Sequence, residues 1–209
     1  MKKCVAACIA AVVLTFIAPS QVRADDGNWF VRLRLLDLAP ANQSNAIPAL
    51  GVPANAITID NKVLPDLDIS YFLRPNISAE LVLTYPQKQS VFLSGTKIGT
   101  FEHLPPSLLL QYHFSPGALV NPYIGAGINY TLIYGTSINV PGVGPLGLSH
   151  SSVGSALQFG ADVKLIRSYY LNVDVKDIGL SSDVTSGGAK VSRVGINPWL
   201  FGIGLGHRF

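Results

Sequence analysis

Charged and polar side chains alternate with apolar ones in several short stretches of the sequence. The stretch WFVRLRLLDL sets Arg32 on the face opposite its apolar neighbours, and ISAELVLTY does the same with Glu80. The same spacing singles out five more residues on polar faces: His113, Asp162, Lys164, Asp174 and Arg208. Side chains of opposite sign that share a buried face must pair, because an unpaired buried charge is costly. The chemistry predicted for this set is an ion-paired polar network.

Hydrolytic chemistry would require a nucleophile beside a base, and a group that orients the base. The stretch SHSS places His150 between serines, but it lies in a Gly-rich segment without an acidic residue nearby. His103 and His207 lie singly near strand ends. The sequence has no phosphate-binding loop, zinc-ligand spacing or basic aromatic patch. We therefore expect no enzyme activity, metal, cofactor or nucleic acid partner.

Eight stretches of alternating polarity predict eight β-strands. They cover residues 29–38, 67–73, 77–85, 107–114, 123–134, 153–164, 170–176 and 199–209. Short connections (74–76, 115–121, 166–168) alternate with long ones (39–64, 86–103, 135–152, 179–197). Barrels of bacterial outer membranes have short periplasmic turns and long external loops. We therefore predict an all-β, eight-stranded antiparallel transmembrane β-barrel that occupies residues 25–209.

The amino terminus predicts a secretory signal peptide over residues 1–24. Lys2 and Lys3 precede an apolar stretch of fifteen residues, and small residues flank Arg23 where signal peptidase reads the chain. This stretch is shorter than the roughly 20 residues of a spanning helix. Cleavage near Ala24 would remove both cysteines and leave twelve basic and twelve acidic residues. A chain that is 48% hydrophobic, without a further long apolar segment, faces lipid only as a closed barrel.

Aromatic residues gather at strand ends, as expected at the two lipid–water boundaries. The alternating connections place one group at the periplasmic end: Trp29, Tyr112, Phe114, Tyr123, Tyr169 and Phe209. They place a second group at the outer end: Tyr85, Tyr130, Tyr134, Trp199 and Phe201. The expected surroundings of the protein are therefore outer-membrane lipid.

Several of these stretches resemble the outer membrane protein W family, which includes the AlkL-type alkane importers. They are LPDLDISYFLRPNISAELVLTYPQK, GTFEHLPPSLLLQYHF, NPYIGAGINYT, LNVDVKDI and INPWLFGIGLGHRF, and they cover most of residues 64–209. The resemblance implies an eight-stranded barrel that passes small hydrophobic molecules across the outer membrane of a Gram-negative-type bacterium. It also implies that the insertion machinery reads Ile203, Leu205 and Phe209 as an assembly signal. His207 departs from that signal, because an aromatic residue is usual there.

The interior of an eight-stranded barrel is just wide enough to be filled by side chains, which excludes a wide aqueous pore. We expect the charged and histidine residues named above to form a polar plug, mostly in the periplasmic half. In the outer half Val82, Leu109 and Leu200 face inward, although Asp68 and Lys176 interrupt the apolar character. The outer segments AIPALGVPANAITI and NVPGVGPLGL are apolar for loops, and their Pro and Gly residues predict no regular structure. These features predict an outward-facing hydrophobic pocket; the alternative is that the two loops pack on one another as a lid.

The pair Pro105–Pro106 is the predicted lateral gate. Proline cannot donate to a strand ladder, so the barrel wall is expected to open where these two residues lie. The functional hypothesis is that a small hydrophobic ligand enters the outer pocket, stops at the plug and leaves sideways into lipid. The alternative is a structural or adhesive barrel whose loops bind a host surface, a phage or another protein.

Overall fold

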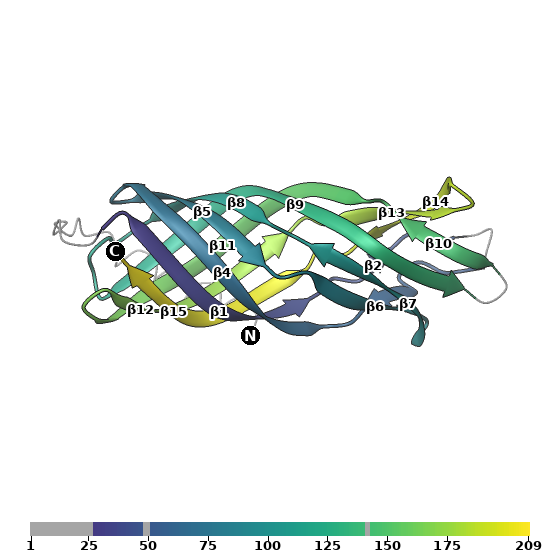
Figure 1. The fold of residues 1–209 in the computed structure, drawn as a ribbon, viewed down its shortest axis with the longest axis horizontal. Coiled ribbons are helices and arrows are strands. Elements are labelled where there is room, and N and C mark those ends of the chain that lie inside the picture. The colour runs from purple at the N-terminus through teal and green to yellow at the C-terminus, as the bar shows by residue number, and fades with distance from the viewer. Residues whose placement is uncertain (1–26, 48–50, 141–142) are drawn as a thin grey trace, which may run out of the picture.

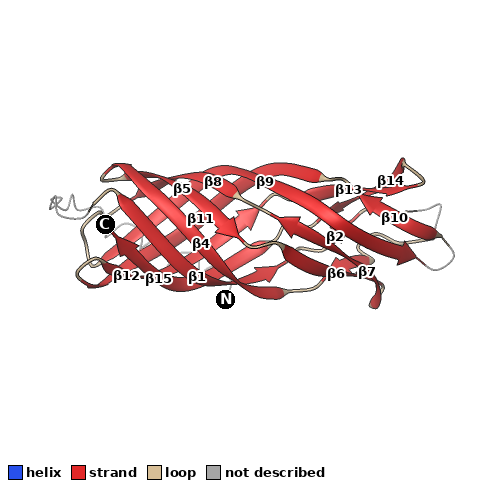
Figure 2. Cartoon of the chain, in the orientation of Figure 1, coloured by secondary structure: helices blue, strands red, loops and turns tan. Residues whose placement is uncertain are grey.

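The computed structural model describes residues 27–47, 51–140 and 143–209, whose strands all belong to one sheet. Figures 1 and 2 show tilted strands along the whole length of the molecule, with the carboxy terminus at the end that carries the short turns. In the described ranges, no helix is long and apolar enough to cross a membrane. The predicted signal peptide, residues 1–24, lies outside the described residues.

Eight strands close into a barrel, which confirms the predicted architecture. In chain order they are β1 (Trp29–Ala39), β4 (Lys62–Arg74), β5 (Ile77–Thr84), β8 (Ser107–His113), β9 (Val120–Val140), β11 (Ser151–Ile166), β12 (Tyr169–Ile178) and β15 (Trp199–Arg208). Each strand pairs antiparallel with the next, and β15 returns to pair with β1 through Leu33 and Leu205. Closure removes the open sheet edges that lipid could not satisfy.

Shorter strands extend the wall beyond the barrel at its outer end. They are β2 (Gln43–Ser44), β3 (Ile57–Ile59), β6 (Gln87–Leu93), β7 (Thr96–Leu104), β10 (Gly144–Leu148), β13 (Ser181–Ser186) and β14 (Ala189–Gly195). The prediction that the two apolar outer segments lack regular structure is therefore wrong, since they contain β3, the end of β9 and β10. Tight turns make such extension possible: Ser94 and Gly95, with φ of 48° and 84°, join β6 to β7.

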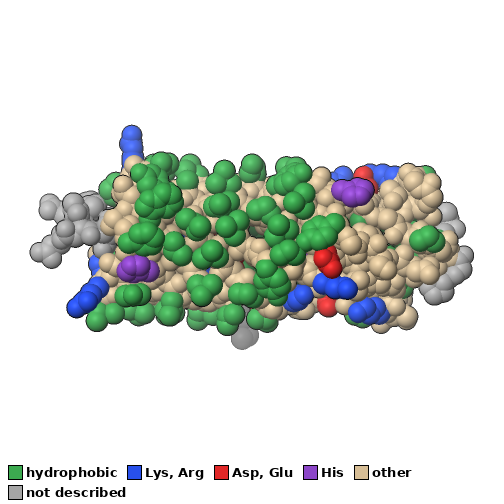
Figure 3. All heavy atoms as spheres, viewed as in Figure 1, with side chains coloured by type: hydrophobic (Ala, Val, Ile, Leu, Met, Phe, Trp, Pro, Cys, Tyr) green, Lys and Arg blue, Asp and Glu red, His purple; other side chains and the backbone are tan. Residues whose placement is uncertain are grey.

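The alternation of side chains separates a lipid face from a filled interior. In β1, Leu33 and Leu35 are 63% and 58% exposed, whereas Arg32 and Arg34 are 0% and 1% exposed. Figure 3 shows the resulting hydrophobic band on the barrel surface, with charged side chains gathered toward its two ends. A surface this apolar matches lipid rather than water, so the band marks the membrane-spanning zone.

The aromatic residues predicted for the two boundaries lie on the outer surface, with one exception. Trp29 and Tyr71 pack edge to face at one end, with ring centroids 4.9 Å apart. Tyr123 is the exception, because its side chain is fully buried inside the barrel. It precedes Ile124, which faces lipid, and alternation therefore turns Tyr123 inward. Its predicted place at the periplasmic boundary is wrong.

The last residue closes the barrel at its periplasmic end. The backbone amide of Phe209 donates to the Trp29 carbonyl oxygen at 2.9 Å, and the amide of Trp29 donates back at 3.0 Å. The Ile203 and Leu205 side chains face lipid, while His207 stacks on Phe209 with ring centroids 5.6 Å apart. The apolar carboxy terminus thus belongs to the lipid face of β15. Its reading by the insertion machinery stays a prediction.

Candidate functional site

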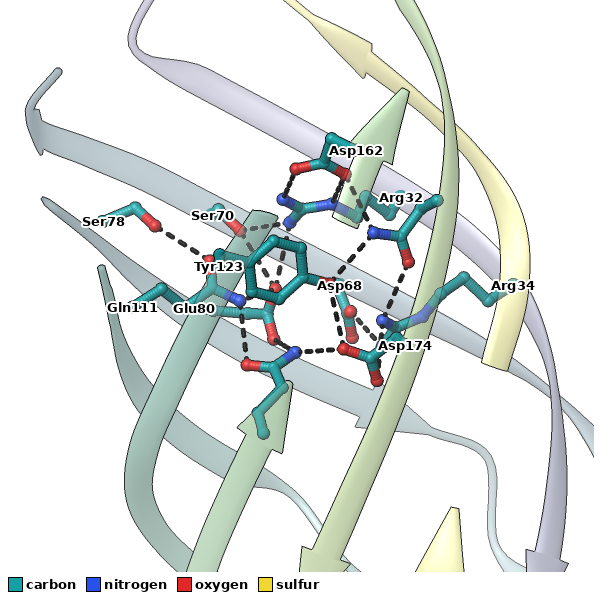
Figure 4. Close-up of polar contacts among 12 residues, drawn as sticks. Arg32, Arg34, Asp68, Ser70, Ser78, Glu80, Gln111, Tyr123, Asp162 and Asp174 are labelled. Carbon is teal, nitrogen blue, oxygen red and sulfur yellow. Dashed lines mark hydrogen bonds and ion pairs between the residues drawn. The ribbon is translucent and has the colours of Figure 1, made fainter. Parts of the chain in front are cut away.

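A buried polar network crosses the periplasmic half of the barrel interior (Figure 4). One centre of it is Arg32, whose Nε and Nη2 atoms donate to the two oxygens of Asp162 at 3.0 and 2.7 Å. The Nη1 atom of Arg32 donates to Ser70 Oγ at 2.8 Å and to Glu80 Oε2 at 3.0 Å. The two-point contact with a carboxylate is the strongest geometry available to a guanidinium group. We call the whole network the polar plug.

A second centre is Arg34, two residues further along β1. Its Nη2 atom donates to Asp66 Oδ2 at 2.6 Å and also contacts the carboxylate of Asp68. Its Nη1 atom lies 3.2 Å from Asp174 Oδ1. Lys176 adds a third cation, with Nζ 2.7 Å from the same Asp174 oxygen. Three cations thus face five carboxylates in the plug, those of Asp66, Asp68, Glu80, Asp162 and Asp174.

Amide and hydroxyl groups join the two centres. Gln158 Nε2 donates to Glu80 Oε1 at 2.9 Å and to Asp174 Oδ2 at 2.7 Å, while Gln111 Nε2 donates to Glu80 Oε2 at 2.8 Å. The Tyr123 hydroxyl donates to Asp174 Oδ2 at 2.9 Å. A Cβ on Gly160 would lie 2.5 Å from the Tyr123 ring, so this glycine makes room for it. These contacts make the plug continuous across the barrel, so the plug blocks its axis.

His113 lies on the periplasmic side of the plug and is fully buried. Asn121 Nδ2 donates to its Nδ1 atom at 3.1 Å, which leaves the proton on Nε2, 3.0 Å from Ser78 Oγ. Its ring lies between those of Phe72 and Tyr123, with centroids 4.8 and 5.2 Å away. Both ring nitrogens are therefore occupied by structural contacts.

The predicted plug residues separate into two groups. The structure brings together Arg32, Glu80, His113, Asp162 and Asp174, all of them buried. Lys164 and Arg208 are only partly buried and lie by the aromatic residues at the periplasmic rim. Arg208 lies 4.0 Å from the Phe72 ring centroid, and Lys164 Nζ lies 5.9 Å from that of Tyr170.

Sequence reasoning missed several members of the plug. Arg34 lies two residues after Arg32, so the same alternation already indicates that its side chain faces inward. The prediction that Asp68 and Lys176 interrupt an apolar outer half is wrong, because both contact the plug. Strand stagger decides at which height along the barrel axis a residue lies, and alternation carries no information on stagger.

Buried apolar side chains continue from the plug to the outer end of the molecule. Val82 and Leu109, which are 3% and 1% exposed, lie at the end of this cluster nearest the plug. Leu200 packs against the cluster from β15. We call the cluster the apolar passage; it includes Val82, Val91, Phe101, Leu109, Ile133, Ile138, Leu146, Ala156, Ile178, Val184, Val194 and Ile196. Its outer part encloses a cavity of about 30 Å³. That volume is far smaller than a medium-chain hydrophobic molecule.

The pairing between neighbouring strands of the barrel wall is interrupted at Pro105 and Pro106. The β5–β8 ladder ends at Val82 and Ser107, and the β6–β7 ladder begins at Gln87 and His103. Residues 83–86 and 104–106, all of them described, form no ladder pair with each other. Pro86 on one side and the two prolines on the other have no N–H to donate. We call this gap the seam.

The opposite side of the two prolines is closed. The amide of Tyr130 on β9 donates to the Pro106 carbonyl oxygen at 3.0 Å. The Asn129 side chain donates to the carbonyl oxygens of Pro105 and Pro106 at 3.2 and 3.1 Å. The structure therefore places the gap between β5–β6 and β7–β8, not toward β9.

Comparison with known proteins finds the same architecture in outer-membrane barrels. The model of the OmpW family matches residues 25–209. An uncharacterized outer-membrane protein of Sinorhizobium fredii, y4mB, is 37% identical over 201 residues, 92% of this chain and 86% of that protein. The dibenzothiophene metabolism operon protein PahQ of Pseudomonas aeruginosa is 26% identical over 211 residues, 96% of this chain and 98% of that protein. The crystal structure of OprG from Pseudomonas aeruginosa matches with a TM-score of 0.75 at 25% identity, over 88% of this chain and 96% of that one.

Proposed function

The chain belongs to the OmpW family of outer-membrane barrels, and from that premise we propose that it lets small hydrophobic molecules cross the outer membrane. The molecule enters at the outer end and moves along the apolar passage. It stops at the polar plug and leaves sideways through the seam into the lipid. The seam is the lateral gate of this proposal, and Pro105 and Pro106 form one side of it.

The observation that carries the proposal is the height at which the seam begins. Val82 and Ser107 form the last pair of the β5–β8 ladder, and Val82 belongs to the lower end of the apolar passage. Two residues before Val82 on the same face, Glu80 already belongs to the plug. A hydrophobic molecule thus meets the gap in the wall where its apolar path ends.

The plug supports a lateral exit over an axial one. An apolar molecule that entered the plug would separate buried charges from their partners, which is strongly unfavourable. Lipid beyond the seam instead offers an apolar environment with no charge to displace. Among the relatives, PahQ is named for a dibenzothiophene metabolism operon, and dibenzothiophene is an apolar compound. That name supports a hydrophobic cargo.

The test is uptake of radiolabelled n-decane by cells that carry the protein and by cells that carry the empty vector. We expect faster uptake in cells that contain the folded barrel in their outer membrane. Equal initial rates, with equal amounts of folded barrel verified by its mobility on gels without heating, would contradict the proposal. In that event the structural or adhesive alternative would gain support.

We also propose that the barrel has no hydrolase activity. His150 is exposed, and the hydroxyl of the neighbouring Ser149 accepts a hydrogen bond from the Asp183 amide at 3.3 Å. The Ser149 hydroxyl is therefore engaged by the backbone of β13. The purified protein should release no fatty acid from phospholipid vesicles. Release that disappears in a His150→Ala variant would contradict this expectation.

A further inference from the structure

Three polar side chains in the outer half of the barrel interior are buried with unused hydrogen-bonding atoms. Gln87 and Gln89 on β6 and His103 on β7 are 0%, 1% and 3% exposed. Gln87 Oε1, both amide atoms of Gln89 and both ring nitrogens of His103 have no partner among the described residues. Native proteins satisfy nearly all buried polar atoms, so three such residues in one place require an explanation. We call them the polar cluster.

The polar cluster borders the apolar passage just above the seam. Gln87 pairs with His103 and Gln89 pairs with Phe101 across the β6–β7 ladder. Val91 and Phe101 belong to the apolar passage and lie on the same faces of these two strands. The Phe101 and His103 ring centroids are 5.7 Å apart. A molecule that moves along the passage to the seam therefore passes the polar cluster.

At a similar height in the barrel, the polar side chains on β8 and β9 do have hydrogen-bond partners. Asn129 Nδ2 donates to Ser107 Oγ at 2.9 Å, and Thr131 Oγ1 donates to Asn129 Oδ1 at 2.6 Å. The polar residues on β8 and β9 thus satisfy one another. Among the described residues, Thr84 Oγ1 on β5 at the edge of the seam and carboxylate oxygens of Asp66 and Asp68 in the plug also lack hydrogen-bond partners. However, β6 and β7 carry the three neutral residues that lie together above the seam.

We propose that the polar cluster binds the hydrogen-bonding head group of an amphiphilic ligand whose tail lies in the apolar passage. The inference rests on the proposed function and names its substrate class: medium-chain molecules with one uncharged head group, such as a primary alcohol. A glutamine amide and a neutral imidazole each offer a donor and an acceptor, and a hydroxyl group can use both. A carboxylate fits less well, because the cluster provides no fixed positive charge to offset its own.

Ligand binding would satisfy groups that the closed state leaves unpaired. The cavity of about 30 Å³ in the passage is too small for a ligand, so entry must displace side chains. The hydrogen bonds that the head group forms with Gln89 and His103 offset part of that cost, because those groups make none at rest. An alkane forms no such bonds. The cluster therefore favours the alcohol over the alkane of equal length.

The direct test is NMR of the full barrel in lipid nanodiscs, titrated with 1-decanol or with n-decane. We expect saturable shifts of the Gln89 side-chain amide and the His103 ring resonances with 1-decanol but not with n-decane. No shift with 1-decanol, or equal shifts with both compounds, would overturn the inference. Neither result depends on whether the compounds cross a membrane.

A second test compares uptake of the two compounds by cells that carry single variants. Gln89→Leu should lower the ratio of 1-decanol to n-decane uptake about fivefold, the factor for one hydrogen bond of about 1 kcal/mol. The matched controls are Gln43→Leu and His150→Leu, both at exposed positions, which should keep the ratio of the unmodified protein. A ratio unchanged in Gln89→Leu would contradict the inference and leave the proposed function intact. Uptake of neither compound above the empty vector would contradict the proposed function, and the NMR result would still decide on the polar cluster.

Discussion

At the scale of single residues, the plug is defined by how its charges are shared. Arg34 contacts the carboxylates of Asp66, Asp68 and Asp174, and its side chain is fully buried. Asp68 Oδ1 and Asp66 Oδ1 have no hydrogen-bond donor within the described chain. Among the described cations, Asp66 pairs with Arg34 alone, whereas Asp68 and Asp174 share Arg34 with Lys176. The loss of Arg34 should cost more than the loss of any one of these carboxylates.

Replacing Arg34 with methionine should destabilise the barrel by about 3–5 kcal/mol, because it leaves buried carboxylates without their main cation. The measurement is the urea midpoint for unfolding of the protein in detergent micelles. The control is Arg193→Met, since Arg193 is exposed, donates to Ser181 Oγ at 2.7 Å and lies 4.0 Å from Asp183 Oδ1. An exposed contact of that kind should be worth less than about 1 kcal/mol. Equal midpoints for the two variants would contradict this role of Arg34.

Tyr123 gives a second prediction at this scale. Its hydroxyl donates to Asp174 and accepts from Asn172 Nδ2 at 3.0 Å, all inside the plug. Tyr123→Phe should therefore lower the free energy of unfolding by about 1–3 kcal/mol. Tyr112→Phe, on the lipid face, should change it by less than half as much. A larger effect of Tyr112→Phe in the same urea titration would be evidence against the inward position of Tyr123.

At the scale of strands, the alternation of polar and apolar residues predicted much of the structure. It was enough for the eight barrel strands and for the inward faces of Arg32, Glu80, Asp162 and Asp174. It was not enough for the outer strands, whose Gly and Pro residues indicated loops but supply the turns between strands. Nor could it place the seam, because the gap depends on how the β5–β8 and β6–β7 ladders end relative to each other.

The seam gives the prediction at the strand scale. Changing Pro105 and Pro106 to valine supplies backbone donors, one of which can bridge the seam and strengthen the closed wall by about 1 kcal/mol. Uptake of n-decane should slow about fivefold. The control is Pro122→Val, because Pro122 lies near the periplasmic end of β9, where it pairs with Ala161 of β11 and is remote from the seam. Unchanged uptake in the double variant would show that the two prolines have no role in the lateral gate.

At the scale of the whole molecule, the barrel turns its apolar residues outward and its charges inward. Leu33, Ile128, Val153 and Phe159 are each more than 60% exposed, while the largest buried side chains include two arginines and a lysine. This inverts the arrangement of a water-soluble protein. Lipid is therefore required for stability, and the charged interior is what closes the axis of the barrel.

The dependence on lipid can be measured on the purified protein. We expect circular dichroism typical of β-structure in detergent or lipid bilayers, and precipitation when the detergent is removed. The apolar band is the physical reason, because water would surround it without compensation. A monodisperse, folded protein in plain buffer would contradict the membrane-spanning assignment of the eight strands.

In the proposed function, the cargo travels through the outer half of the barrel only and leaves above the plug. The most direct measurement is photo-crosslinking of the reconstituted barrel with a decane analogue that carries a diazirine, mapped by mass spectrometry. On inward-facing side chains, we predict adducts at Val82, Phe101 and Leu109, in the apolar passage. Adducts at Phe30 or Phe72, on the periplasmic side of the plug, would show that the cargo crosses the plug and would contradict the account.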